Sequence, residues 1–140
     1  MSGFAGPLDV QILDVGRGGR VTAKLLSAFS YDVGGKGSGE TLTVPAGYLT
    51  DFASVPQPFW NIEPPLGDAG KAAVVHDALY STAGTMLIGG FCGRTRKKPY
   101  ARAEADGIFD EALAVLAVPA WKRALLWAAV RVGGAGGWGR

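Results

Sequence analysis

The feature that most constrains the fold is a change of pattern partway along the chain, from strand-like segments to helical ones. Segments 10–15 (VQILDV) and 21–33 (VTAKLLSAFSYDV) flank the turn sequence GRGG, which predicts a hairpin. Segment 41–49 (TLTVPAGYL) predicts a third strand that ends in a Pro-Ala-Gly turn. The first fifty residues are therefore expected to form a small antiparallel sheet.

Helical patterns begin after residues 50–68, which contain four prolines and are expected to form an ordered loop. Three helices are predicted, at residues 67–82, 100–116 and 119–132. Asp68 is a plausible N-cap for the first helix, and Pro119 opens the third at a favoured first-turn position. We expect two of these helices to pack antiparallel.

Strands followed by helices predict an α+β fold. At 140 residues, with 48% hydrophobic and 19% charged residues, the chain has the balance of one globular domain. We expect this domain to span residues 1–133, followed by a flexible glycine-rich tail at residues 134–140.

Several classes of protein are excluded by simple features of the sequence. A single cysteine, Cys92, excludes an internal disulfide framework and a cysteine-based zinc site. The first ten residues carry neither a charged segment nor a long apolar one, so no signal peptide is expected. The most apolar segment, residues 112–132, contains Pro119, Lys122 and Arg123 near its centre, which argues against a membrane span.

The charge of the chain is concentrated in one run. The net charge of +2 and the pI near 8.8 are too weak to indicate a nucleic-acid partner. The segment RTRKKPYAR, however, contains five basic residues and no acidic one: Arg94, Arg96, Lys97, Lys98 and Arg102. This run predicts either a patch that binds phosphate or a solvated loop before a helix.

The chain's only histidine, His76, stands beside an aspartate in the apolar run KAAVVHDALYST. On a helix, Tyr80 lies one turn after His76 on the same face, whereas Asp77 lies about 100° around the axis and could hold a cation. On the next predicted helix, Asp106 borders the apolar stripe, so antiparallel packing would bring it near His76. Such a dyad could deprotonate water, because the carboxylate fixes the imidazole tautomer and stabilises the imidazolium.

A structural interpretation of the same residues stays open. His76, Asp77, Tyr80 and Asp51 could form a buried hydrogen-bond network that fastens the loop TDFASVP onto the helices. Ser54 could also act as a nucleophile with the His–Asp pair. However, FASVP lacks the G-x-S-x-G elbow, and a turn or cap following Asp51 explains Ser54 better.

The third predicted helix adds a candidate surface. Trp121 and Leu125 fall one turn apart, as do Arg123 and Trp127. Core packing explains such a stripe, and so does docking of this helix, together with the tail residue Trp138, on a partner protein or a membrane surface. In the docking interpretation the protein is a virion, assembly or host-interaction factor.

Four sequence blocks, VPAGYLTDFASVP, AAVVHDALY, RAEADGIFDEAL and WKRALLWAAVRVGG, resemble the phage- and prophage-encoded domain-of-unknown-function family 1353. The resemblance covers residues 44–133. It implies a viral or prophage origin and a location in the host cytoplasm or the virion. It does not supply an activity.

The spacing H-D-x-x-Y followed by A-D-x-x-F is also similar, more weakly, to the core of viral-type phospholipase A2 domains. The resemblance implies that His76 is the water-activating base, that Asp77 is a calcium ligand, that Tyr80 supports the site and that Asp106 orients His76. Calcium would polarise the ester carbonyl. The basic run would then face lipid phosphate.

The chain departs from the phospholipase pattern at the calcium loop. Those enzymes place Y-x-G-x-G before the histidine, whereas this chain has PPLGDAG, and only Asp51 or Asp68 could assist Asp77. The sequence thus predicts a His–Asp site on a helix pair, with two functions open. One is a calcium-assisted hydrolase of lipid or cell-envelope esters, and the other is a non-enzymatic virion, assembly or host-interaction protein. The oligomeric state is not predicted.

Overall fold

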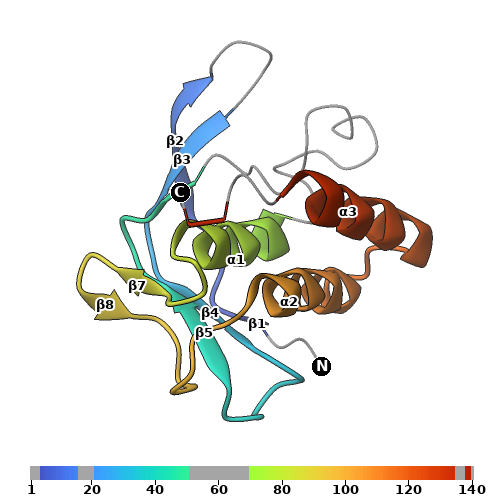
Figure 1. Ribbon diagram of the computed structural model, residues 1–140. Helices are drawn as coiled ribbons and strands as arrows, with labels where there is room; N and C mark the ends of the chain where they lie inside the picture. Colours follow the sequence, from blue (N-terminus) through green and yellow to red (C-terminus); the bar gives the residue numbers. More distant parts are fainter. Residues whose placement is uncertain (1–3, 16–20, 51–69, 135–137, 140) are drawn as a thin grey trace.

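The fold is α+β, with antiparallel strands in the first part of the chain and three helices after them (Figure 1). The structure is a computed structural model and describes residues 4–15, 21–50, 70–134 and 138–139. Its elements are β1 (Phe4–Ala5), β2 (Val10–Val15), β3 (Val21–Leu25), β4 (Phe29–Asp32), β5 (Thr41–Val44), β6 (Leu49–Thr50), α1 (Gly70–Ser81), β7 (Leu87–Ile88), β8 (Phe91–Cys92), α2 (Arg102–Val115) and α3 (Ala120–Gly133). The predicted fold class is therefore confirmed.

The strands form more than the one sheet expected from the sequence. Two antiparallel three-stranded sheets have the orders β1-β4-β5 and β2-β3-β6, and β7 and β8 form a separate hairpin. The single strand predicted at residues 21–33 is wrong, because the chain bends after Leu25 and β3 and β4 join different sheets. Ala23, Leu25, Phe29 and Tyr31 are all buried, so the alternation continues in phase across the bend and does not reveal it.

Helix α1 is the central element of the helical part. Nine of its residues are buried, and it packs against α2 and against strands β5 and β6. A helix that is apolar on most of its circumference is typical of such a buried position. Its observed start at Gly70 leaves the predicted cap, Asp68, outside the described residues.

Helices α1 and α2 pack as an antiparallel pair, as predicted. Gly84, three residues after the end of α1, accepts a hydrogen bond through its carbonyl oxygen from Tyr100 N, just before α2 begins, at 3.0 Å. Further along, His76 of α1 lies against Phe109 of α2, with ring centroids 4.6 Å apart. This arrangement places the polar residues of the two helices opposite each other.

Helices α1 and α2 both end in a Schellman motif with alanine in the left-handed position. Ala83 has φ of +50° and Ala117 has φ of +63°. At the end of α2, Val118 N donates to Leu113 O at 3.0 Å, which is the long hydrogen bond of this motif. Glycine is the usual residue here, so these helix ends are held by packing rather than by local preference.

Helix α3 packs on α2 and ends within about two residues of its predicted boundary. Only Leu126 and Val130 of α3 are buried, so its contact with the core is narrow. In the described part of the chain, none of the helices has the length and apolar character needed to cross a bilayer.

Candidate functional site

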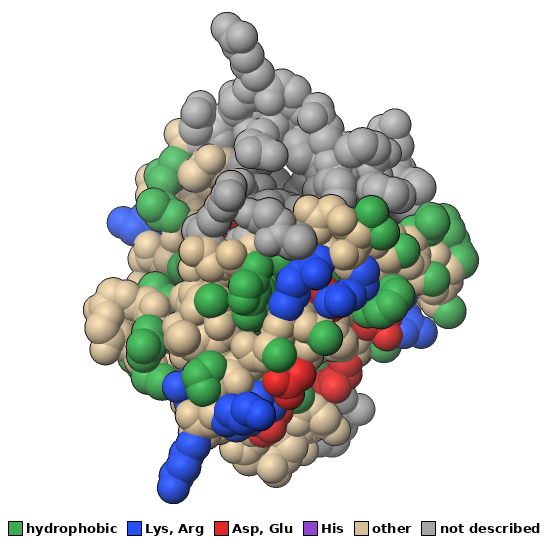
Figure 2. Space-filling model, in the orientation of Figure 1, with side chains coloured by type: hydrophobic (Ala, Val, Ile, Leu, Met, Phe, Trp, Pro, Cys, Tyr) green, Lys and Arg blue, Asp and Glu red, His purple; other side chains and the backbone are tan. Residues whose placement is uncertain are grey.

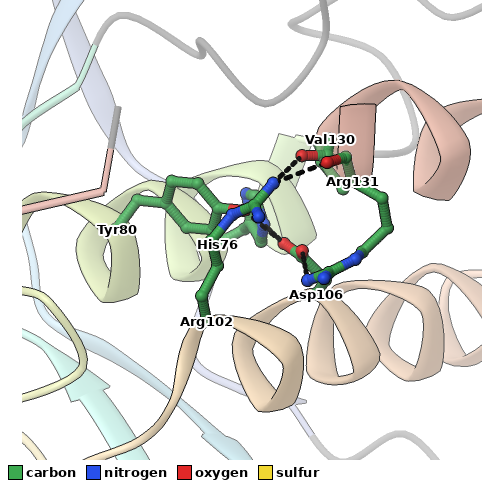
Figure 3. Close-up of polar contacts among 6 residues, drawn as sticks. All are labelled: His76, Tyr80, Arg102, Asp106, Val130 and Arg131. Carbon is green, nitrogen blue, oxygen red and sulfur yellow. Dashed lines mark hydrogen bonds and ion pairs between the residues drawn. The ribbon is translucent and has the colours of Figure 1, made fainter. Parts of the chain in front are cut away.

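The predicted His–Asp pair is present and buried between α1 and α2 (Figure 3). His76 Nε2 lies 2.7 Å from Asp106 Oδ1, and the Tyr80 hydroxyl donates to the same oxygen at 2.7 Å. The sequence predicts that antiparallel packing of the two helices brings Asp106 close to His76, and this contact is confirmed. The chemical role of these residues stays a prediction.

Two arginines complete the cluster. Arg131 Nη1, on α3, donates to Asp106 Oδ2 at 2.7 Å, and Arg102 Nε, at the start of α2, donates to the Tyr80 hydroxyl at 3.0 Å. Arg102 Nη2 also donates to the carbonyl oxygens of Val130 and Arg131, at 3.0 and 2.7 Å (Figure 3). Val130 O also accepts from Gly134 N at 2.9 Å, whereas Arg131 O lies in the last turn of α3, where backbone acceptors lack partners within the helix. The cluster therefore fastens all three helices together.

The two arginines differ in how clearly the local sequence indicates a place in the site. Arg102 lies four residues before Asp106, a spacing that places both on one face of α2 and could have suggested a shared site. Arg131 is 25 residues from Asp106, and no local pattern connects them. We call the set His76, Tyr80, Arg102, Asp106 and Arg131 the five-residue network.

The centre of the five-residue network is sealed from solvent. His76 is 2% exposed and Asp106 is 0% exposed. The His76 ring lies against the rings of Tyr80 and Phe109, with centroid distances of 4.3 and 4.6 Å. A catalytic imidazole needs a path to substrate, so this burial favours the structural interpretation over the enzymatic one.

Burial and hydrogen bonds act in opposite directions on the charges of the pair. Burial lowers the pKa of His76 below its usual value, and the bond to Asp106 opposes this only in part. Burial alone would raise the pKa of Asp106, but bonds from His76, Tyr80 and Arg131 outweigh it and hold the pKa below its usual value. The pair is thus a neutral imidazole whose Nε2–H donates to a carboxylate.

The lowered pKa predicts that acid destabilises the fold. As the pH falls from 7 toward 5 the unfolded chain protonates its histidine near the ordinary pKa of about 6.5, whereas the folded chain, in which the pKa of His76 is lowered, takes up that proton only at lower pH. The free energy of unfolding should therefore decrease as the pH is lowered, by at most about 1.4 kcal/mol per pH unit. Urea titrations over this range should show the fall, and His76→Asn should remove it, because His76 is the only histidine. A wild-type stability that rises toward pH 5 would contradict the neutral imidazole.

Asp77 belongs to a second group, separate from the five-residue network. Its Oδ2 accepts hydrogen bonds from the Tyr48 hydroxyl at 3.0 Å and from Thr50 Oγ1 at 2.8 Å. These bonds tie α1 to strand β6 and the residue before it. Over the described residues no group of three or more histidine, cysteine or acidic side chains could hold a metal ion.

Two predicted site residues, Asp51 and Ser54, lie outside the described residues.

The five residues of the basic run do not form one patch, because three of them bind other parts of the protein. Arg94 folds back onto backbone carbonyls, including Thr85 O at 2.9 Å, and Arg96 binds Glu104 through two bonds of 2.7 and 2.9 Å. Arg102 joins the five-residue network, so a patch as predicted would rest on Lys97 and Lys98, which are exposed.

The tail residues that the structure describes lie against α1. The Trp138 ring meets the Tyr80 ring edge-on, with centroids 5.1 Å apart, and Gly139 N donates to Tyr80 O at 2.6 Å. Trp138 therefore packs against the core next to the network. The proposed boundary between domain and tail stays a prediction.

A second candidate site is the outer face of α3, formed by Trp121, Ala124, Leu125, Ala128 and Val132. Trp121 is 58% exposed, Leu125 40% and Val132 88%, and both alanines are exposed. Hydrophobic side chains are visible on the surface over α3 (Figure 2). The stripe through Trp121 and Leu125 thus points away from the core, and core packing does not explain it.

Comparison with known proteins identifies a family. Residues 23–130 match the family described as "Protein of unknown function (DUF1353)". No curated protein and no solved structure matches the chain.

Proposed function

Since this chain belongs to the DUF1353 family, whose description names no activity, we propose a function from its surfaces: a non-enzymatic assembly protein that associates with copies of itself through α3. The observation that carries this proposal is the exposed outer face of α3. A virion or prophage origin, which the family resemblance implies, is compatible with a role in assembly.

The outer face of α3 has the composition of an interface core. Between Trp121 and Val132 its positions are apolar, and the arginines of this helix lie beside or behind it and bind carboxylates of α2. Interface cores are depleted of charge and enriched in tryptophan. Helices that bind anionic lipid instead present several basic side chains to the headgroups. The face therefore fits a protein partner better than a lipid surface.

The order of side chains along α3 favours a second copy in antiparallel orientation. If two copies cross near the middle of the helix, the large Leu125 of each lies opposite the small Ala128 of the other. Trp121 then lies opposite Val132 at both ends. Such a contact is self-complementary, as a two-fold interface requires.

The five-residue network has a structural role in this proposal. Arg102 binds the carbonyls at the end of α3, and Arg131 of α3 binds the buried Asp106. These bonds hold α3 through a narrow buried face, which leaves the opposite face available.

Analytical ultracentrifugation tests the proposal. The native chain should sediment as a monomer–dimer equilibrium, and Trp121→Glu/Leu125→Glu should weaken dimerisation by about 100-fold or more. The effect follows because burying each apolar side chain is worth roughly 1.5–3 kcal/mol. Leu87→Glu is the matched control, since Leu87 is 56% exposed but lies on β7, and it should leave the dimer intact. A native chain that stays monomeric throughout would refute self-association, and binding to lipid vesicles by that monomer would favour the membrane alternative.

A hydrolase is the second candidate, favoured by the 2.7 Å contact between His76 and Asp106. Asp106 would fix the tautomer of His76, and the imidazole would accept a proton from water attacking an ester carbonyl. A soluble ester and phospholipid vesicles, each with and without added calcium, test this activity. If the site is catalytic, His76→Asn should lower the rate by about 10²–10⁴-fold while the protein stays folded. No hydrolysis by the folded native chain would exclude this candidate for those substrates.

A further inference from the structure

We infer that Arg102 and Arg131 together form a binding site for a phosphate-type oxyanion where α2 meets the end of α3. The site lies on the solvent side of the five-residue network. It shares only Arg102 with the basic run of the sequence, in which Lys97 and Lys98 are the exposed cations. The inference does not depend on self-association through α3.

The first observation is an imbalance of charge. Of the three arginines on α2 and α3, Arg123 pairs with Asp110 at 3.3 Å and Arg131 pairs with Asp106 at 2.7 Å. Arg102 contacts only neutral oxygens within the part of the chain that the structure describes. The carbonyls at the end of α3 offset about half a charge, so the cluster keeps a positive excess. Arg102 therefore carries a charge that no carboxylate of the described residues neutralises, and a bound anion would neutralise it.

The second observation is a set of unused donors. Arg131 binds Asp106 through Nη1, and its Nε and Nη2 make no bond to the described residues. That edge is the one through which arginine grips an oxyanion with two parallel bonds. Arg102 uses Nε and Nη2 and leaves Nη1. Three donors from two guanidinium groups match the three free oxygens of a phosphate group better than the two of a carboxylate.

The third observation is that the two groups are held in place and remain accessible. The Arg131 side chain is 32% exposed, whereas its partner Asp106 is 0% exposed. Arg102 is also partly exposed. Basic side chains reach the surface in the middle of the face shown in Figure 2, over the junction of α2 and α3. Donors that are positioned before the ligand arrives bind it with less loss of side-chain freedom.

Arginine side-chain NMR on the native protein tests the site without any substitution. Inorganic phosphate is added at constant ionic strength, with chloride as the reference anion. We expect a saturable shift of the Arg131 Nε–H resonance, which chloride does not reproduce. Arg131→Lys keeps the charge but loses the two-bond edge, so it should weaken phosphate affinity by about tenfold. Lys97→Ala/Lys98→Ala is the control and should leave the affinity unchanged.

Two results would overturn the inference. One is a phosphate shift that never saturates or equals that of chloride. The other is phosphate binding that survives Arg131→Lys and disappears in Lys97→Ala/Lys98→Ala, which would place the anion on the basic loop. Repeating the titration in Trp121→Glu/Leu125→Glu separates this site from dimerisation.

Further arms of the experiment identify the source of the phosphate group. Glycerol 3-phosphate represents a soluble ligand, and vesicles that contain phosphatidic acid represent a lipid headgroup, with phosphatidylcholine vesicles as the reference. A shift with the soluble ester assigns the site to soluble phosphates. A saturable shift with inorganic phosphate and with phosphatidic acid vesicles, but not with glycerol 3-phosphate, assigns it to lipid. The absence of any shift in all arms would refute the site.

Discussion

Asp106→Asn is expected to lower the free energy of unfolding by about 3–5 kcal/mol, the range found when one partner of a buried charge pair is removed. Asp106 accepts three hydrogen bonds, two on Oδ1 and one on Oδ2. Asparagine has one oxygen and one NH2 group, so in either orientation an N–H would face a donor of Arg131 or the donors of His76 and Tyr80. For a domain whose total stability is about 5–15 kcal/mol, this loss is a large fraction.

Asp110→Asn is the matched control for this substitution. Asp110 lies one turn later on α2 and pairs with Arg123 at 3.3 Å, but its side chain is 40% exposed. Because exposed ion pairs contribute little, its loss should change stability by about 1 kcal/mol or less. Urea denaturation followed by circular dichroism measures both variants. If Asp106→Asn is as mild as Asp110→Asn, the five-residue network does not hold the helices together.

Gly84→Ala is expected to destabilise the protein by about 2–5 kcal/mol, as the sum of two effects. The φ of Gly84 is +81°, and an alanine in that region loses roughly 1–2 kcal/mol. An added Cβ would also lie 1.9 Å from Tyr100 O, and relieving such a clash in packed structure costs roughly 1–3 kcal/mol. The close approach joins the end of α1 to the start of α2. The substitution should therefore also displace Arg102 from Tyr80.

Gly90→Ala separates the two effects. Gly90 has φ of +86°, but a Cβ there would meet nothing within 4 Å. Gly90→Ala should therefore lower the free energy of unfolding only by the cost of the backbone conformation, about 1–2 kcal/mol. Thermal and urea unfolding measure the stability of both variants. If Gly84→Ala and Gly90→Ala lose the same free energy of unfolding, the clash with Tyr100 makes no contribution. A weakened interaction between Arg102 and Tyr80 in Gly84→Ala would appear as a change in the arginine NMR spectrum.

Much of the helical half of the site follows from local sequence. The spacing of His76 and Tyr80 places both on one face of α1, and Asp106 borders the apolar stripe of the next helix. Antiparallel packing, which the pattern of two apolar helices favours, then brings the pair together at 2.7 Å. The sequence also pointed to Asp77 as a cation ligand, which stays a prediction; in the structure its Oδ2 accepts hydrogen bonds from the hydroxyls of Tyr48 and Thr50.

The strands show why local pattern has limits. The alternation through Ala23, Leu25, Phe29 and Tyr31 stays in phase across the bend between β3 and β4. No glycine or proline marks residues 26–28. Periodicity reports which side of the chain is buried, and it does not report which strand lies alongside.

By itself, therefore, the sequence determined the α+β order of elements, the helix boundaries to within a few residues and the facing positions of His76 and Asp106, because these depend on near neighbours along the chain. Only the tertiary structure decided that Arg131, 25 residues from Asp106, completes the network. It also decided which side of α3 is buried. Both sides of that helix carry large apolar residues, so its periodicity is compatible with either orientation. The choice depends on the bonds that Arg102 and Asp106 make to its last turn, and these form only when the three helices meet.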